Sequence, residues 1–206
     1  MHTWRRVPRG LVTGAWLVCG VMLLVRAATA ESAIDLLPFV RLASVLFAGV
    51  SVFALDDPAA PVTVSTEAGR LRLRAAVVAA TLPAVAAAWL SIVLGARLIA
   101  GSPDELPVAG LLVELLALMA AGWFIAAMMN SEARDTDVAA RAAGALVIMV
   151  AMTLSVPRLV HALWVGPGTE WNRSHGRWSA IACLAFGGFL WLSRDPAGRA
   201  VRHRVR

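Results

Sequence analysis

Charged residues and cysteines are scarce in this sequence. Of its 206 residues only 16% are charged, two are cysteines, and none is Lys or Tyr. With so few charges, a disordered tail, a coiled coil and a soluble enzyme are all poor fits. Cys19 and Cys183 both lie in apolar runs. We expect them to be packed thiols, because disulfide frameworks belong to small, cysteine-rich secreted domains.

Catalytic motifs are absent from the sequence as well. It has no Walker-type phosphate loop, no G-x-S-x-G and no H-E-x-x-H. The chain therefore cannot hydrolyse ATP by itself. We expect neither an enzyme nor a bound cofactor.

Hydrophobic residues, in contrast, make up 59% of the chain, whereas soluble domains contain about 45–50%. A domain of this size cannot bury such an excess in one core. The apolar residues form six runs near the length of roughly 17–25 residues that spans a bilayer. The bilayer core offers no hydrogen-bond partners, so backbone polar groups must bond within a helix. We therefore predict an all-α bundle of six transmembrane helices. It forms a single integral membrane domain over residues 1–206, with spans at about 10–28, 36–55, 75–99, 106–129, 142–165 and 178–193.

Arginine is distributed unevenly among the segments that join these spans. With the N-terminus placed inside, the inner segments hold thirteen Arg and seven acidic residues, and the rest of the chain holds six of each. Cytoplasmic segments carry the basic excess in membrane proteins. We therefore expect a multi-pass protein of the cell (plasma) membrane with both termini in the cytoplasm. This distribution explains the formal charge of +6 without nucleic-acid binding.

The first apolar run has a second interpretation. Arg5, Arg6 and Arg9 precede it, and Ala28-Thr29-Ala30 follows it. This is also the plan of a secretory signal peptide. Cleavage after Ala30 would leave five spans in unchanged orientation. We favour a retained helix, because the rest of the chain is itself polytopic and needs no separate export signal.

Ionisable residues inside the predicted spans are the candidate functional residues. Each costs about 2.5–3.5 kcal/mol on insertion scales unless it is paired or faces a cavity. Glu114 therefore needs a partner, with Arg41 the first choice and Arg158 the second. Two interpretations stay open, a polar cluster that lines an outward-facing substrate path and a structural ion pair with snorkelling arginines. The candidate cluster comprises Glu114, Arg41, Arg158, His161 and Arg97.

Two histidines near the predicted outer surface could suggest a metal. His161 and His175 lie close in sequence to Glu170. Their spacing fits no metal-site template. We expect histidines at the lipid interface and no metal.

The inner segments could form a docking surface for a partner subunit. Asp-Pro at residues 57–58 is a favoured turn start. Asp137 stands four residues before Arg141, a spacing that supports a helix. Short helices that press on a partner and plain solvated connectors are both compatible with this pattern. The candidate docking residues are Asp56, Asp57, Arg70, Arg72, Arg74, Asp135, Asp137 and Arg141.

Three short segments resemble a known family. They are F-A-L-D-D-P-A-A-P at Phe53–Pro61, W-N-R-S-H-G-R-W at Trp171–Trp178 and S-R-D-P-A-G-R at Ser193–Arg199. Together they are similar to small six-span integral membrane proteins of actinobacteria regarded as ABC-transporter membrane subunits. The likeness runs from about Leu36 to Arg199. A second likeness, to copper-resistance membrane proteins, rests on Arg41-Leu42-Ala43 and Gly49.

The first resemblance implies the transmembrane subunit of an ABC-type export system. Such a subunit works in the lipid bilayer with a separate ATP-binding subunit, as a homodimer or hetero-oligomer. The chain is shorter than familiar six-span permeases, which leaves room for an accessory role. The alternatives are a metal- or haem-handling membrane protein and a non-transporting membrane scaffold.

Overall fold

The computed structural model describes residues 9–28, 30, 32, 34–55, 70–100, 106–132 and 137–194. All regular secondary structure in these residues is helical, which confirms the expected all-α class. The elements are α1 (Arg9–Ala27), η2 (Ile34–Leu36), α2 (Leu37–Phe53), α4 (Arg70–Ala100), α5 (Val108–Glu132), α6 (Val138–Ser155), α7 (Pro157–Leu163) and α8 (Trp171–Leu192).

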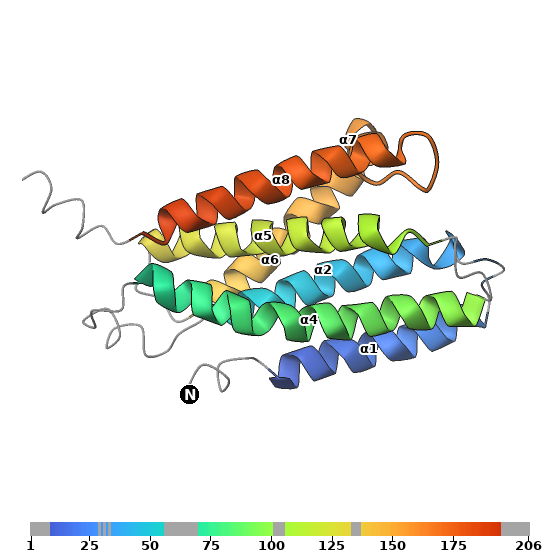
Figure 1. The fold of residues 1–206 in the computed structure, drawn as a ribbon, viewed down its shortest axis with the longest axis horizontal. Coiled ribbons are helices and arrows are strands. Elements are labelled where there is room, and N and C mark those ends of the chain that lie inside the picture. Colours follow the sequence, from blue (N-terminus) through green and yellow to red (C-terminus); the bar gives the residue numbers. More distant parts are fainter. Residues whose placement is uncertain are drawn as a thin grey trace, which may run out of the picture.

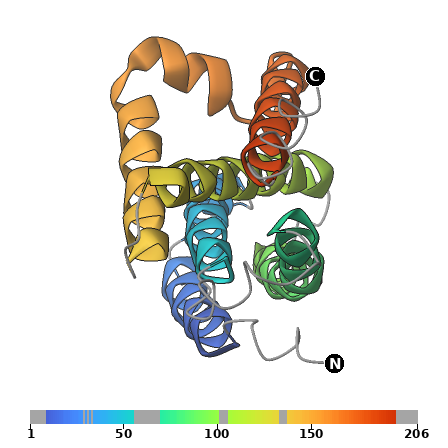
Figure 2. The ribbon, with the colours of Figure 1, turned by 90° about the vertical axis from the view of Figure 1, so that its left-hand side faces the viewer.

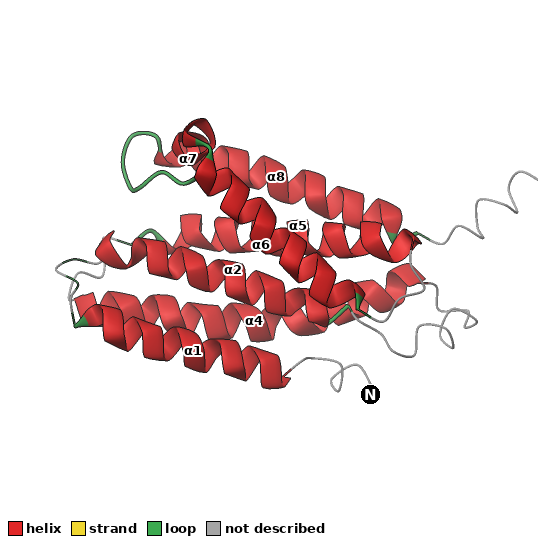
Figure 3. Cartoon of the chain, turned by 180° about the vertical axis from the view of Figure 1, so that it is seen from behind, coloured by secondary structure: helices red, strands yellow, loops and turns green. Residues whose placement is uncertain are grey.

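Successive long helices run in alternating directions through one bundle (Figure 1). Helices α2 and α5 are central; α1 and α4 pack on one side, whereas α6 and α8 pack on the other (Figures 2 and 3). We call the end at which α2, α5 and α8 begin the cluster end. The opposite end is the one at which α4 and α6 begin. The alternation places the start of α1 and the end of α8 toward the same end of the bundle.

Five of these helices are long and apolar enough to cross a membrane. They cover residues 9–26, 34–53, 74–99, 108–129 and 138–155. Helices α1 and α6 also expose apolar side chains outward, such as Leu24 and Val25 on α1 and Ile148 and Met152 on α6. Water-soluble proteins rarely expose such continuous apolar faces. The fold is therefore that of a helical membrane protein, whereas a sixth crossing stays a prediction.

The expected fifth span, 142–165, is wrong as a continuous helix. Helix α6 ends at Ser155, and α7 begins at Pro157 and turns toward α8 (Figure 2). The cause is local, because a proline ring clashes with a helical conformation of the residue before it. Val156 accordingly has extended torsions, φ −105° and ψ 108°.

The helix that contains the expected sixth span begins before Trp178. Helix α8 begins at Trp171, so the C-terminal part of the connector expected over 166–177 is helical. Its 22 residues give a length of about 33 Å at 1.5 Å per residue, against about 30 Å for the hydrocarbon core. Its first two turns carry polar residues, and α8 is not among the five apolar spans.

Three of the predicted docking residues lie at the start of a long helix. Arg70, Arg72 and Arg74 belong to the first turns of α4. Arg74 is buried, and its Nη1 donates a hydrogen bond to Ser193 Oγ at 3.1 Å. This contact ties the start of α4 to the end of α8. Arg74 is therefore not an exposed docking residue, whereas Arg72 is exposed.

Three of the other predicted docking residues lie outside the described residues: Asp56, Asp57 and Asp135. Asp137 occupies the N-cap position of α6 without a side-chain capping hydrogen bond. Both Asp137 and Arg141 are exposed.

The two cysteines differ in their surroundings. Cys19 is fully buried, as expected, but Cys183 is exposed on α8. The prediction of a packed thiol is therefore wrong at Cys183, because the apolar run that contains it has one face turned away from the bundle.

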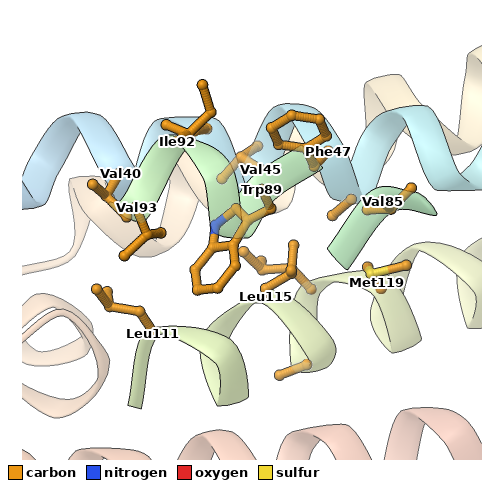
Figure 4. Packing of buried hydrophobic residues seen from close by; sticks show 14 of the residues in the cluster. Val40, Val45, Phe47, Val85, Trp89, Ile92, Val93, Leu111, Leu115 and Met119 are labelled. Atoms are coloured by element: carbon orange, nitrogen blue, oxygen red, sulfur yellow. The ribbon is translucent and has the colours of Figure 1, made fainter. Parts of the chain in front are cut away.

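The hydrophobic core lies where α2, α4 and α5 meet, around Trp89 (Figure 4). The indole is fully buried, and its Nε1 donates a hydrogen bond to Ser44 Oγ at 2.8 Å. Ser44 Oγ in turn donates to Val40 O at 3.1 Å. The polar atom of this large side chain is thus satisfied inside the core. Residues packed around it include Val40, Val45, Phe47, Val85, Ile92, Val93, Leu111, Leu115 and Met119.

We expect Trp89→Phe to lower the free energy of unfolding by about 1–2 kcal/mol. The change removes the indole hydrogen bond and leaves a small void. Trp191→Phe is the matched control, because Trp191 is 57% exposed; its effect should stay within about 0.5 kcal/mol. Denaturant titration in mild detergent, followed by circular dichroism, measures both. Equal losses would contradict the assigned role of Trp89.

Candidate functional site at one end of the bundle

A buried ion pair lies near the cluster end. Glu114, on the second turn of α5, is fully buried, and Arg41 of α2 is 9% exposed. Arg41 Nε donates to Glu114 Oε2 at 2.9 Å, and Arg41 Nη2 donates to Oε1 at 2.7 Å. Two parallel charge-assisted bonds make this a strong, directional contact. The structure thus places the first-choice partner, Arg41, against Glu114.

Arg41 also binds the chain that follows α7. Its Nη1 donates to Trp164 O at 3.0 Å, and its Nη2 donates to Val165 O at 2.7 Å. Since the last carbonyls of a helix lack partners within it, a guanidinium at this position satisfies them. Arg41 therefore links α2, α5 and the α7–α8 connection through one side chain.

Side chains of α8 bind the two preceding carbonyls. Ser174 Oγ and Trp178 Nε1 donate to Leu163 O at 2.7 and 2.8 Å. Arg177 Nη1 donates to Ala162 O at 2.8 Å. Four consecutive carbonyls, from residue 162 to residue 165, are thus held by side chains from α8 and α2. We call these four carbonyl groups the carbonyl row.

His175 of α8 completes the arrangement. Its Nδ1 lies 2.8 Å from Trp171 O, and its Nε2 lies 3.2 Å from Glu114 Oε1. The second distance is that of an ion pair, but the atoms lack hydrogen-bond geometry, so Nε2 has no hydrogen-bond partner. The rings of His175 and Trp171 lie 4.0 Å apart, centroid to centroid. Arg41, Glu114 and His175 together are called the charged cluster below.

Two indoles flank the guanidinium. Arg41 Cζ lies 5.5 Å from the ring centroid of Trp164 and 5.9 Å from that of Trp171. The faces of aromatic rings attract cations at such distances. They add to the stabilisation of positive charge in the charged cluster.

Gly110 allows α5 to approach α8 at this point. A Cβ atom at Gly110 would lie 2.6 Å from Trp171 Cζ2 and 2.7 Å from His175 Nε2. Both distances are too short for real contacts, so any larger residue would displace these rings. Small residues serve helix packing in membranes in the same way.

Among the described residues, Glu114 pairs with Arg41 and His175 and not with the other three predicted cluster residues. Arg158 and His161 are exposed on α7. Arg97, near the end of α4, donates through Nε and Nη2 to Leu106 O. The prediction that all five residues gather into one cluster is therefore not met for these three.

His175 was not among the residues predicted to form the cluster. The spacing of Trp171 and His175, one helical turn apart, could have placed both side chains on one helix face. That prediction requires a helix that begins at Trp171. Among the described residues, no group of three or more His, Cys, Asp and Glu side chains is placed to hold a metal ion. His161 and His175 also differ, since one is exposed and the other buried.

Comparison with known proteins gives no match. No family model, curated protein or solved structure is similar to this chain. The class of the protein therefore rests on its own fold and site: a helical membrane protein with a buried charged cluster at one end.

Proposed function

We propose that this chain is the transmembrane subunit of an ABC-type export system and works with a separate ATP-binding subunit. The observation that carries the proposal is the pair of Arg41 and Glu114, which is buried within apolar helices. Ionisable groups at such positions are expensive, and they are typical of substrate paths and gates.

The contacts of Arg41 give this pair a mechanical role in the proposal. The pair joins α2 and α5 and, through the carbonyl row, holds the α7–α8 connection across the cluster end. Release of these bonds would free that connection from α2. In a transport cycle the charged cluster would thus keep one side of the pathway closed.

Six crossings and a cytoplasmic opposite end belong to the same proposal. Helix α8 is long enough to cross the bilayer, and its packing along α5 supports a sixth crossing. The first turns of α4 carry Arg70, Arg72 and Arg74 at the opposite end, as the positive-inside rule favours for a cytoplasmic face. Two copies of the chain would supply twelve helices.

Docking of the ATP-binding subunit tests the proposal. We expect it to co-purify with the tagged full-length chain in mild detergent. The double variant Arg72→Ala/Arg141→Ala should reduce its recovery and the ATPase activity severalfold, because both side chains are exposed at the opposite end. Arg173→Ala is the matched control, since it removes an exposed arginine near the cluster end.

Two results would contradict this function. One is a complex without any ATP-binding subunit. The other is equal recovery from the double variant and the Arg173→Ala control.

A membrane accessory subunit without transport is the second candidate. It is favoured by the way Arg41 is engaged, because each of its three nitrogen atoms donates a hydrogen bond to an internal acceptor. A purely structural lock would have this arrangement too. An accessory subunit predicts stable partners whose ATPase activity does not respond to substrates.

A further inference from the structure

The hydrogen atoms of His175 follow from its acceptors. Nδ1 lies 2.8 Å from the carbonyl oxygen of Trp171. A carbonyl oxygen only accepts hydrogen bonds, so Nδ1 carries a hydrogen and donates it. In neutral histidine the other nitrogen, Nε2, would then present a lone pair.

That lone pair would lie beside a carboxylate oxygen without being aligned with it. Nε2 lies 3.2 Å from Glu114 Oε1 and is buried without a hydrogen-bond partner. A nitrogen lone pair and an ionised oxygen at this distance repel one another, and no water separates them at contact distance. We propose that His175 Nε2 and Glu114 Oε1 form a buried proton-binding site that holds one proton in addition to the hydrogen on Nδ1.

The proton balance has two equivalent forms. With the proton on Nε2, an imidazolium lies beside a carboxylate; with the proton on Oε1, a neutral imidazole lies beside a carboxylic acid. Each form has zero net charge for the pair and +1 for the charged cluster with Arg41. Loss of the proton leaves the pair at −1 and the charged cluster neutral.

The surroundings are suited to the extra positive charge. Oxygens of Trp164 and Val165 accept from Arg41, and the oxygen of Trp171 accepts from His175. The indole faces of Trp164 and Trp171 lie near the guanidinium. Carbonyl oxygens and aromatic faces both stabilise cations. Arg41 and a protonated His175 therefore do not depend on the Glu114 carboxylate alone, because carbonyl oxygens and indole faces also stabilise their positive charge.

The remaining charged groups on the packed helices are directed elsewhere. Glu170 and Arg173 pair with each other on the surface, and Arg177 binds Ala162 O. Arg158 and His161 of α7 are exposed, and Arg97 of α4 binds Leu106 O. Among the described residues, the charges that bear on the site directly are Arg41 from α2 and Glu114 from α5.

Loss of the proton would therefore act on helix packing. Repulsion between Nε2 and Oε1 would drive the imidazole from Glu114 at a point where α5 and α8 approach closely, beside Gly110. Protonation of this site would therefore control how closely α5 and α8 pack at the cluster end. This holds whether or not the chain belongs to an ABC-type system.

Magnetic resonance of the full-length chain tests the proposal directly. The variant His2→Gln/His161→Gln/His203→Gln leaves His175 as the single histidine and leaves the charged cluster intact. Its ring nitrogens, labelled with nitrogen-15 in lipid bilayers, report which of them carries hydrogen. Infrared spectra of the same chain with carbon-13-labelled glutamate report a protonated carboxyl group, measured near neutral pH.

We expect either two protonated ring nitrogens, or hydrogen on Nδ1 alone together with a protonated glutamate that disappears in Glu114→Gln. A ring with hydrogen on Nε2 alone would overturn the proposal. Hydrogen on Nδ1 alone without a protonated glutamate would overturn it as well. If Glu114→Gln does not fold, Glu114→Asp replaces it, and the band of the labelled, protonated glutamate should disappear.

Discussion

Arg41→Gln is expected to lower the free energy of unfolding by about 3–5 kcal/mol, the cost of removing one partner of a buried ion pair. The variant removes both charge-assisted bonds to Glu114 and leaves the oxygens of Trp164 and Val165 without their donors. The carboxylate would stay in an apolar environment with only His175 beside it. Denaturant titration of the chain in mild detergent, followed by circular dichroism, measures the loss.

A double-mutant cycle isolates the pair from its surroundings. Glu114→Gln alone should cost a similar amount, because it leaves the guanidinium buried without a counter-ion. The double variant Arg41→Gln/Glu114→Gln should cost clearly less than the sum of the two, since neither charge remains. A strictly additive double variant would show that the two groups do not stabilise each other.

The exposed pair of Glu170 and Arg173 is the natural control for this cycle. Its side chains are 50% and 67% exposed, although the contact, at 2.8 Å, lies between the 2.7 and 2.9 Å of the buried pair. Surface pairs contribute about 0–1 kcal/mol. Arg173→Gln should therefore change stability little, which separates the effect of burial from that of the salt-bridge distance.

The pairing of Arg41 with Glu114 could be predicted from the sequence, and the reason is energetic. A carboxylate in an apolar run needs a cation, and the chain offers few arginines within its spans. The helical class followed in the same way, since 59% hydrophobic residues in long runs leave few other folds. Both inferences depend on composition and cost, which are visible without any tertiary structure.

His175 could not be predicted because its role depends on where α8 begins. Hydropathy favours a start at Trp178, where the apolar run begins. The helix instead extends back over polar residues to Trp171, and Ser174, Arg177 and Trp178 bind the carbonyl row. Those carbonyls are free because α7 ends at Leu163, and the break before Pro157 directs α7 toward α8. Tertiary contacts thus extend the helix and place His175 beside Glu114.

Arg74 shows the opposite limit. Arginine counting assigns it correctly to one end of the bundle, but the count does not distinguish an exposed arginine from a buried one. In the structure Arg74 donates to Ser193 Oγ across the bundle. A charge pattern therefore does not indicate which charged side chains a partner could reach.

Gly110→Ala is the second large expected effect, a loss of about 1–3 kcal/mol from overpacking. The added methyl group would meet two rings, Trp171 at 2.6 Å and His175 at 2.7 Å. Neither ring can yield easily, because His175 is bound to Trp171 O and packed against Glu114. Thermal unfolding in mild detergent, followed by circular dichroism, measures the change.

Gly144→Ala provides the matched control on α6. No atom lies within 4 Å of the Cβ that it would add, so the substitution should stabilise the helix by about 0.5–1 kcal/mol through alanine's higher helix propensity. The two variants make the same chemical change and differ only in what the methyl group meets. A loss of stability at Gly110 together with a gain at Gly144 would confirm that α5 and α8 are in close contact at Gly110. A gain in stability at both would mean that His175 lies farther from α5 than the structure has it, and the proton-binding site would lose its geometric basis.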